Sequence, residues 1–432
     1  MVIDLSAIPS PKRPVRPVRG RSSWYPFYPG FSDSFSSAIL RQLRVSGATV
    51  LDSWNGAGTT TATAAQLGLG AVGIDLNPAM VVAARSRLLD PLDAPSLRPL
   101  GAQILKVARS KYSEGLDSDP LSDLFWPQGN GAIRSIELSI REVLVDPARL
   151  PCSAEFFEDM SPLACFFYVA LFRTAKQLLA HQASSNPVWT RMRLSRLQRV
   201  RPTYESVRAT FAKEYCSMAD EEAEGRPSPR ATSPRVQIRL ASSTRLPVGD
   251  DSAQLALCSP PYCTRVDYAV ATFPELAILG YERDASFDQL RRSLIGTTTV
   301  ESGADVISKK WGPTCVEFLE GVKDHESRAS STYYFKNHAR YFAQLFSSMC
   351  ELSRVMSPGG TVVMVVQDSY YKNIHNDLPR VVSEMGESVG MKRSGVREFP
   401  LKRLLAVSNP KVRNYRGNSV SAIESVVALA AH

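Results

Sequence analysis

Two aspartates and two glycines stand at the ends of neighbouring apolar segments, in the pattern of a nucleotide-binding turn. In "LDSWNGAGTTT", Asp52 ends one apolar run, and Gly56 and Gly58 follow it. Glycines let the backbone approach a ligand closely, and the helix that follows offers free N–H groups at its first turn. Asp75 ends the next apolar run, where a carboxylate can accept hydrogen bonds from both hydroxyls of a ribose.

The details of this turn favour a nucleoside cofactor that has no pyrophosphate. A dinucleotide site and a purely structural turn share the same outline, but Thr61 replaces the third glycine of GxGxxG, and Asp52 precedes the turn. S-adenosylmethionine is a cofactor of this kind, because its ammonium group needs a nearby carboxylate or carbonyl.

A second chemical motif, Ser-Pro-Pro-Tyr, follows the apolar run that ends at Cys258 in "ALCSPPYCTRVDY". Proline restricts the backbone, so the Pro260 carbonyl is held in place beside the Ser259 hydroxyl, and both oxygens can accept hydrogen bonds. Tyr262 offers a flat aromatic face on which a planar ring can stack. A strand followed by a proline-rich turn is the structural alternative.

Both motifs lie in an alternating pattern of strands and helices. Strands are expected at 48–54, 71–76, 235–241, 253–259, 361–369 and 424–431, and helices after Gly58, over 77–89 and over 337–356. This alternation predicts an α/β fold with parallel strands and crossover helices.

The alternation is interrupted by a long segment that is mostly helical. We expect a flexible basic arm at 1–22, a first half of the main domain at 23–92, a helical insertion at 93–234 and a second half at 235–432. Within the insertion, 189–215 predicts an amphipathic helix, interrupted near Pro202, with its basic residues outward. These residues can contact phosphates or form a solvated basic face.

Composition narrows the class of protein. The chain has 432 residues, a formal net charge of +9 and a pI near 9.2, which favours an anionic partner such as nucleic acid. Its seven cysteines form no CxxC pair, so neither a metal site nor a disulfide framework is expected. The longest apolar run, 163–172, is too short to cross a bilayer, so we expect no membrane association and a cytoplasmic, nucleoid-associated protein.

Taken together, the motifs resemble those of the amino-group DNA methyltransferases. "DSWNGAGTT" is similar to their D-P-F-x-G-x-G-T-T motif, "SPPY" to their [DNS]-P-P-[YFW] motif, and "LSRVMSPGG" to their R-V-L-x-P-G-G strand entry. "WYPFYPGFSDSF" resembles the segment that precedes the first motif and closes over methionine. The resemblance covers roughly residues 20–90 and 235–432, and leaves out the insertion.

The resemblance implies a Rossmann-like methyltransferase with a mainly parallel seven-stranded sheet, a large helical insertion, S-adenosylmethionine as cofactor and duplex DNA as partner, with the target base flipped. Catalytic roles fall to Ser259, Pro260, Pro261 and Tyr262. Cofactor-binding roles fall to Tyr28, Asp52, Trp54, Gly56, Gly58, Thr59, Thr60, Asp75 and Ser242. Substrate-binding roles fall to Asp267, Tyr268, Arg191, Arg193, Arg196 and Arg199. Ser242 stands where the family often has an acid.

The reaction implied is direct transfer of a methyl group to an exocyclic amine. Such an amine is a weak nucleophile, and acceptors that grip both of its N–H bonds can aim it at the methyl group. Serine in the first position of the Ser-Pro-Pro-Tyr motif favours cytosine N4 over adenine N6 as the methylated atom.

An RNA amine methyltransferase and a catalytically silent DNA-binding protein remain alternatives. Methylation at cytosine C5 is disfavoured, because the only Pro-Cys dipeptide lies in the insertion. A cognate nuclease or other defence protein is a candidate partner.

Overall fold

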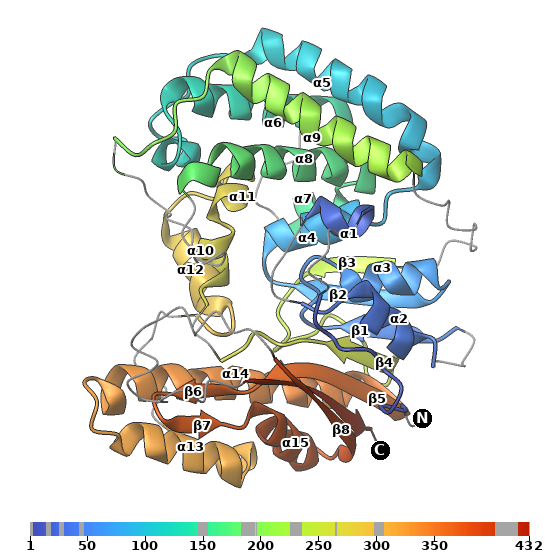
Figure 1. Ribbon diagram of the computed structural model, residues 1–432, viewed down its shortest axis with the longest axis vertical. Coiled ribbons are helices and arrows are strands. Elements are labelled where there is room, and N and C mark those ends of the chain that lie inside the picture. Colours follow the sequence, from blue (N-terminus) through green and yellow to red (C-terminus); the bar gives the residue numbers. More distant parts are fainter. Residues whose placement is uncertain are drawn as a thin grey trace.

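The computed structural model describes residues 3–13, 19–25, 30–42, 47–145, 154–182, 195, 197–224, 236–263, 266–297, 306–401 and 422–431. At its centre lies a seven-stranded sheet in the order β3-β2-β1-β4-β5-β9-β8 (Figure 1). The strands are β1 Thr49–Asp52, β2 Gly70–Asp75, β3 Val236–Leu240, β4 Ala253–Cys258, β5 Met356–Gln367, β8 Lys392–Pro400 and β9 Ile423–Ala430. The first five are parallel, and β9 is antiparallel to β5 and β8. The predicted α/β fold with a mainly parallel seven-stranded sheet is confirmed.

Alternate residues of each central strand face opposite sides of the sheet, as the pleat requires. Val50 and Leu255 pack toward α2 Asp33–Leu40 and α3 Thr59–Gln66. Leu51 and Ala256 pack toward a second set of helices on the other face. These helices are α13 Pro313–Asp324, α14 Phe335–Val355 and α15 Leu378–Ser388. Because both faces are covered, the inner strands are mostly apolar.

The insertion forms a helical layer at the top of Figure 1. Its helices are α5 Leu97–Lys111, α6 Pro127–Leu144, α7 Ala154–Asp159, α8 Pro162–Leu178 and α9 Tyr204–Glu224. They share one apolar core with α4 Pro78–Ser86 and α11 Phe273–Ile278. The Arg134 guanidinium also donates hydrogen bonds of 2.9 and 2.8 Å to the carbonyls of Ala277 and Ile278. The layer therefore supports the segment that follows Ser-Pro-Pro-Tyr.

Shorter elements complete the fold. They are α1 Arg21–Trp24, α10 Tyr268–Ala271, α12 Ala285–Ser293, the hairpin of β6 Ser369–Tyr371 and β7 Ile374–Asn376, 3-10 turns at Pro91–Ser96, Pro120–Asp123, Ala180–Gln182 and Lys309–Trp311, and a π turn at Ser330–Tyr334.

Of the amphipathic helix expected over 189–215 with an interruption near Pro202, the structure shows the part that follows the proline, since α9 begins at Tyr204. Val200 lies before the interruption and forms an isolated bridge with Phe125. Pro202 lacks an N–H and disfavours helix in the residue before it, and residues 189–194 and 196 lie outside the described residues. Strand β8 was not predicted, because as an edge strand it is mostly exposed and has no apolar run.

Residues 3–13 also differ from the flexible arm expected at 1–22. Ile3 and Ile8 are 4% and 3% exposed, and they pack in the core beside α2. The Arg397 side chain on β8 donates hydrogen bonds to the carbonyls of Leu5 and Ser6. Burial of two isoleucines and pairing of two carbonyls hold this segment against the sheet.

Candidate functional site

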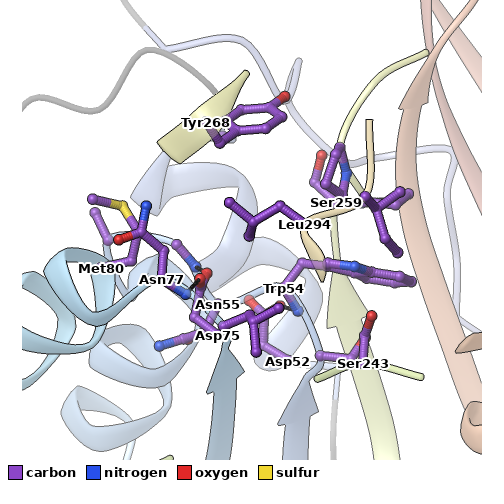
Figure 2. A pocket seen from close by; sticks show the side chains of 18 of the residues that line it. Asp52, Trp54, Asn55, Asp75, Asn77, Met80, Ser243, Ser259, Tyr268 and Leu294 are labelled. Carbon is purple, nitrogen blue, oxygen red and sulfur yellow. Dashed lines mark hydrogen bonds between the residues drawn. The ribbon is translucent and has the colours of Figure 1, made fainter. Parts of the chain in front are cut away.

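A pocket opens where the carboxyl ends of β1, β2 and β4 meet (Figure 2). Because these strands are parallel neighbours, the loops that follow them lie at one edge of the sheet. The pocket is lined by Arg13, Gly30, Phe31, Asp52, Ser53, Trp54, Asn55, Gly56, Ala57, Thr59, Asp75, Leu76, Asn77, Met80, Ala241, Ser242, Ser243, Ser259, Pro260, Pro261, Tyr262, Tyr268, Ser293, Leu294 and Ile295. The two sequence motifs therefore contribute to one cavity, although Asn55 and Ser259 are 204 positions apart in the chain.

The glycine turn is fixed to strand β2 and to the start of α3. The Gly58 N–H donates to the Asn55 carbonyl at 2.8 Å, and the Asn55 N–H donates to the Ile74 carbonyl at 2.9 Å. Gly58 has φ +80°, in the left-handed region that glycine adopts without strain. A Cβ at Gly58 would lie 2.8 Å from the Ala84 Cβ, so the close approach of α4 also requires glycine.

Asp52 ends β1 and is almost fully buried beside the turn. Its carboxylate accepts hydrogen bonds from the Thr60 hydroxyl at 2.6 Å and from the Trp54 N–H at 3.1 Å. Burial raises the pKa of Asp52 to about 7, although both hydrogen bonds act in the opposite direction. Thr60 also donates to the Leu257 carbonyl at 3.1 Å, which ties this group to strand β4.

Asp75 ends β2 on the same side of the pocket. One carboxylate oxygen accepts from the Gly56 N–H and the other from the Asn77 N–H, both at 2.8 Å. Burial raises the pKa of Asp75 to about 6. Two backbone donors thus fix the orientation of a carboxylate that lines the cavity (Figure 2).

The raised pKa of Asp52 predicts a pH-dependent stability. The folded protein keeps this proton to a higher pH than the unfolded chain, so the free energy of unfolding falls as the pH rises from about 4 to 7. We expect Asp52→Asn to remove this loss. Relative to the variant, the wild type should lose about 2–3 kcal/mol between pH 5 and pH 8 in urea denaturation. Parallel pH profiles for the two proteins would contradict the assignment.

The Ser-Pro-Pro-Tyr segment leaves β4 at the pocket wall and is held by neighbouring elements. The Ser259 hydroxyl donates to the Val365 carbonyl on β5 at 2.9 Å, and the Tyr341 hydroxyl on α14 donates to the Pro261 carbonyl at 2.8 Å. The Ser259 oxygen keeps lone pairs that can accept a hydrogen bond from a ligand. No backbone donor within the described part of the chain reaches the Pro260 carbonyl.

Tyr262 forms a pairing that the sequence does not reveal. Its hydroxyl donates to a carboxylate oxygen of Glu424 at 3.1 Å, at the start of β9. Burial raises the pKa of Glu424, and burial together with this carboxylate raises the pKa of Tyr262 well above its usual value. The ring of Tyr262 is therefore anchored at its hydroxyl end while it lines the cavity.

The structure places most of the predicted site residues at this cavity. All four residues of Ser-Pro-Pro-Tyr line it, and so do Asp52, Trp54, Gly56, Thr59, Asp75, Ser242 and Tyr268. Gly58 and Thr60 are not lining residues but hold the turn. Burial raises the pKa of Tyr268 to about 12, so its hydroxyl stays protonated.

Two other predicted residues, Asp267 and Arg199, do not line the cavity. Asp267 caps α10 through the Val270 N–H and forms an ion pair with Arg291 at 2.8 Å, so it has a structural role rather than the predicted place in the pocket. Arg199 precedes α9 and is not among the lining residues. The predictions for Tyr28, Arg191, Arg193 and Arg196 lie outside the described residues.

Several lining residues were not predicted. Asn77 lies two positions after Asp75 and could have been found from the position of β2. Arg13 and Leu294 reach the pocket from distant segments, and no local pattern marks them.

Within the described residues, no group of three or more His, Cys, Asp or Glu side chains could hold a metal ion. None of the helices in the described ranges is long and apolar enough to cross a membrane.

Comparisons with known proteins relate the chain to Type II methyltransferases. No family model matches it. It is 21% identical over 435 residues to the Type II methyltransferase M.BsoBI of Geobacillus stearothermophilus, covering 91% of this chain and 82% of that protein. Two Type II methyltransferases M.AvaI, from Nostoc sp. and from Anabaena variabilis, are each 26% identical over 156 residues, which is 33% of this chain and 32% of theirs.

Solved structures give only distant matches. Geranyl diphosphate methyltransferase in complex with GPP and sinefungin has a TM-score of 0.31 and 8% identity, covering 91% of this chain and 77% of that one. The YcgJ protein of Bacillus has a TM-score of 0.31 and 7% identity, covering 91% of this chain and 97% of that one. These values are too low to support an argument. By sequence, the chain is similar to the Type II methyltransferase M.BsoBI over most of its length and to the M.AvaI proteins over a third of it.

Proposed function

We propose that the protein is an S-adenosylmethionine-dependent DNA methyltransferase that modifies an exocyclic amino group of a flipped base, with cytosine N4 as the favoured target. The observation that carries this proposal is the single pocket lined by both the glycine turn and Ser-Pro-Pro-Tyr. The similarity to M.BsoBI along 91% of the chain supports it.

The chemistry of the pocket fits the proposed cofactor. Asp75 is an acceptor suited to a ribose diol, and Asp52 is an acceptor suited to an ammonium group. The Asn55 Nδ2 atom is buried and has no partner within the described residues, so a polar ligand could satisfy it. When bound, S-adenosylmethionine supplies an electrophilic methyl group.

The chain's own residues then orient the base. The Ser259 oxygen and the Pro260 carbonyl accept from the two N–H bonds of the amine, which favours a more tetrahedral nitrogen. Tyr262 provides the stacking surface, held at its hydroxyl by Glu424. Tyr268 lines the same pocket. The amine nitrogen would form its new bond to the methyl carbon as the carbon–sulfur bond breaks and the sulfur keeps the electron pair. The nitrogen's extra proton would leave to solvent or to a nearby acceptor.

A labelling experiment tests the proposal and separates its alternatives. Purified protein should transfer labelled methyl groups from S-adenosylmethionine to duplex DNA, and digestion with mass spectrometry should show N4-methylcytosine. N6-methyladenine would change the base but keep the class of reaction. Labelling of tRNA or rRNA and not DNA would overturn the DNA proposal, and binding to DNA without transfer would point to a silent DNA-binding protein. Methylation mapping of cells that express the chain would give the recognition site.

We also propose that the insertion at 93–234 contacts the duplex. The support is its basic character around Arg199, which is only partly buried. Arg199→Glu should weaken duplex binding and reduce the slope of log affinity against log salt by about 1 for each phosphate that the variant no longer neutralises. Arg41→Glu, an exposed guanidinium at the end of α2, serves as the control. An unchanged slope for Arg199→Glu would remove this residue from the interface.

A further inference from the structure

The guanidinium of Arg13 reaches the pocket from the N-terminal segment, beside the glycine turn. It donates hydrogen bonds to the Phe31 carbonyl at 3.4 Å and to the Thr59 hydroxyl at 3.2 Å, and it lines the cavity. Both contacts are to neutral oxygens, so neither neutralises its charge. The packing of Ile3 and Ile8 on the sheet fixes the segment that carries it.

A second guanidinium lies next to Arg13 and takes the nearby carboxylate. Arg87, which is 6% exposed, donates to the same Thr59 hydroxyl at 3.2 Å and to Asp33 at 2.6 Å. Burial, and then the charge of Arg87, lowers the pKa of Arg13, while Asp33 acts in the opposite direction. Two cations thus share one anion, which leaves a net positive charge at this end of the pocket.

The negative charge of Asp52 is held by the next residue of α3, Thr60. Thr59 holds both guanidinium groups, while the next residue, Thr60, donates to the Asp52 carboxylate at 2.6 Å. Arg13 and Asp52 both line the pocket, so the cavity carries a cationic group and an acidic group. An α-amino acid group carries the complementary pair of charges.

We propose that Arg13 binds the carboxylate of the methionine part of S-adenosylmethionine, while Asp52 faces the ammonium group. This inference rests on the proposed function, and it assigns to the N-terminal segment a direct part in cofactor selection. A guanidinium binds a carboxylate more strongly than a neutral donor does, because the hydrogen bonds are charge-assisted.

Calorimetry with two ligands tests Arg13 separately from the methyl transfer. The wild type should bind S-adenosylmethionine about 10- to 100-fold more tightly than decarboxylated S-adenosylmethionine, which lacks only the carboxylate. Arg13→Met should weaken binding of the first ligand by a similar factor and leave the second nearly unchanged. Arg41→Met, which removes an exposed guanidinium outside the pocket, should keep the wild-type preference.

The outcomes separate this inference from the function on which it rests. If Arg13→Met kept the wild-type preference for the carboxylated ligand, the assignment of Arg13 would be overturned. If the wild type bound neither ligand, the cofactor itself would be wrong. Thermal unfolding of each variant without ligand shows whether a lost affinity reflects a lost fold, and Arg13→Lys should then restore part of the preference.

Discussion

Tyr262→Ala is expected to slow methyl transfer to DNA by about 10- to 100-fold and to leave the affinity for S-adenosylmethionine nearly unchanged. The expected size follows from the loss of one base-aromatic stack, which is worth about 1–3 kcal/mol. Tyr262 lines the pocket and belongs to the same four-residue segment as the two proposed acceptors, Ser259 and Pro260. Single-turnover kinetics with saturating cofactor would measure the effect on transfer, and calorimetry would measure cofactor affinity.

The conservative variant Tyr262→Phe is the matched control. It keeps the stacking face and loses only the hydroxyl that donates to Glu424 at 3.1 Å. We therefore expect it to retain most of the activity that Tyr262→Ala loses. If Tyr262→Ala instead abolished cofactor binding and transferred methyl groups normally at saturating cofactor, Tyr262 would belong to the cofactor side of the pocket, and its proposed role would be wrong.

The meeting of the two motifs could be predicted because it depends on general properties of parallel sheets. The apolar runs of β1, β2 and β4 are visible in the sequence, and each is followed by a polar or glycine-rich loop. Once these strands are parallel neighbours, their carboxyl ends must lie together. Asp52, Asp75 and Ser259 were accordingly placed without knowledge of any long-range contact.

Other parts of the site depend on contacts that no local pattern encodes. The hydrogen bond from Tyr262 to Glu424 joins residues 162 positions apart. Arg13 lies in a segment whose composition predicts disorder, yet the burial of Ile3 and Ile8 orders it. Asp267 was predicted at the pocket from its place after the motif, but Arg291, on a separate helix, takes its carboxylate. In each case tertiary packing decides between roles that the sequence leaves open.

The glycine turn provides the second large prediction, which concerns stability. Gly58→Ala should lower the free energy of unfolding by about 2–5 kcal/mol, because two costs add. An alanine at φ +80° costs about 1–2 kcal/mol. Its Cβ would also lie 2.8 Å from the Ala84 Cβ and 2.9 Å from the Ala84 Cα, and such overpacking costs about 1–3 kcal/mol more.

Gly47→Ala separates the two costs. Gly47 has nearly the same φ, +78°, but a Cβ there would have no atom of the described residues within 4 Å, so only the backbone cost applies. Urea denaturation should therefore show a loss of about 1–2 kcal/mol for Gly47→Ala and a clearly larger loss for Gly58→Ala. Equal losses would mean that α4 moves away without cost.

Gly58 also sets the start of α3, where Thr59 contacts Arg13 and Thr60 contacts Asp52. Gly58→Ala should therefore weaken cofactor binding as well, whereas Gly47→Ala should not.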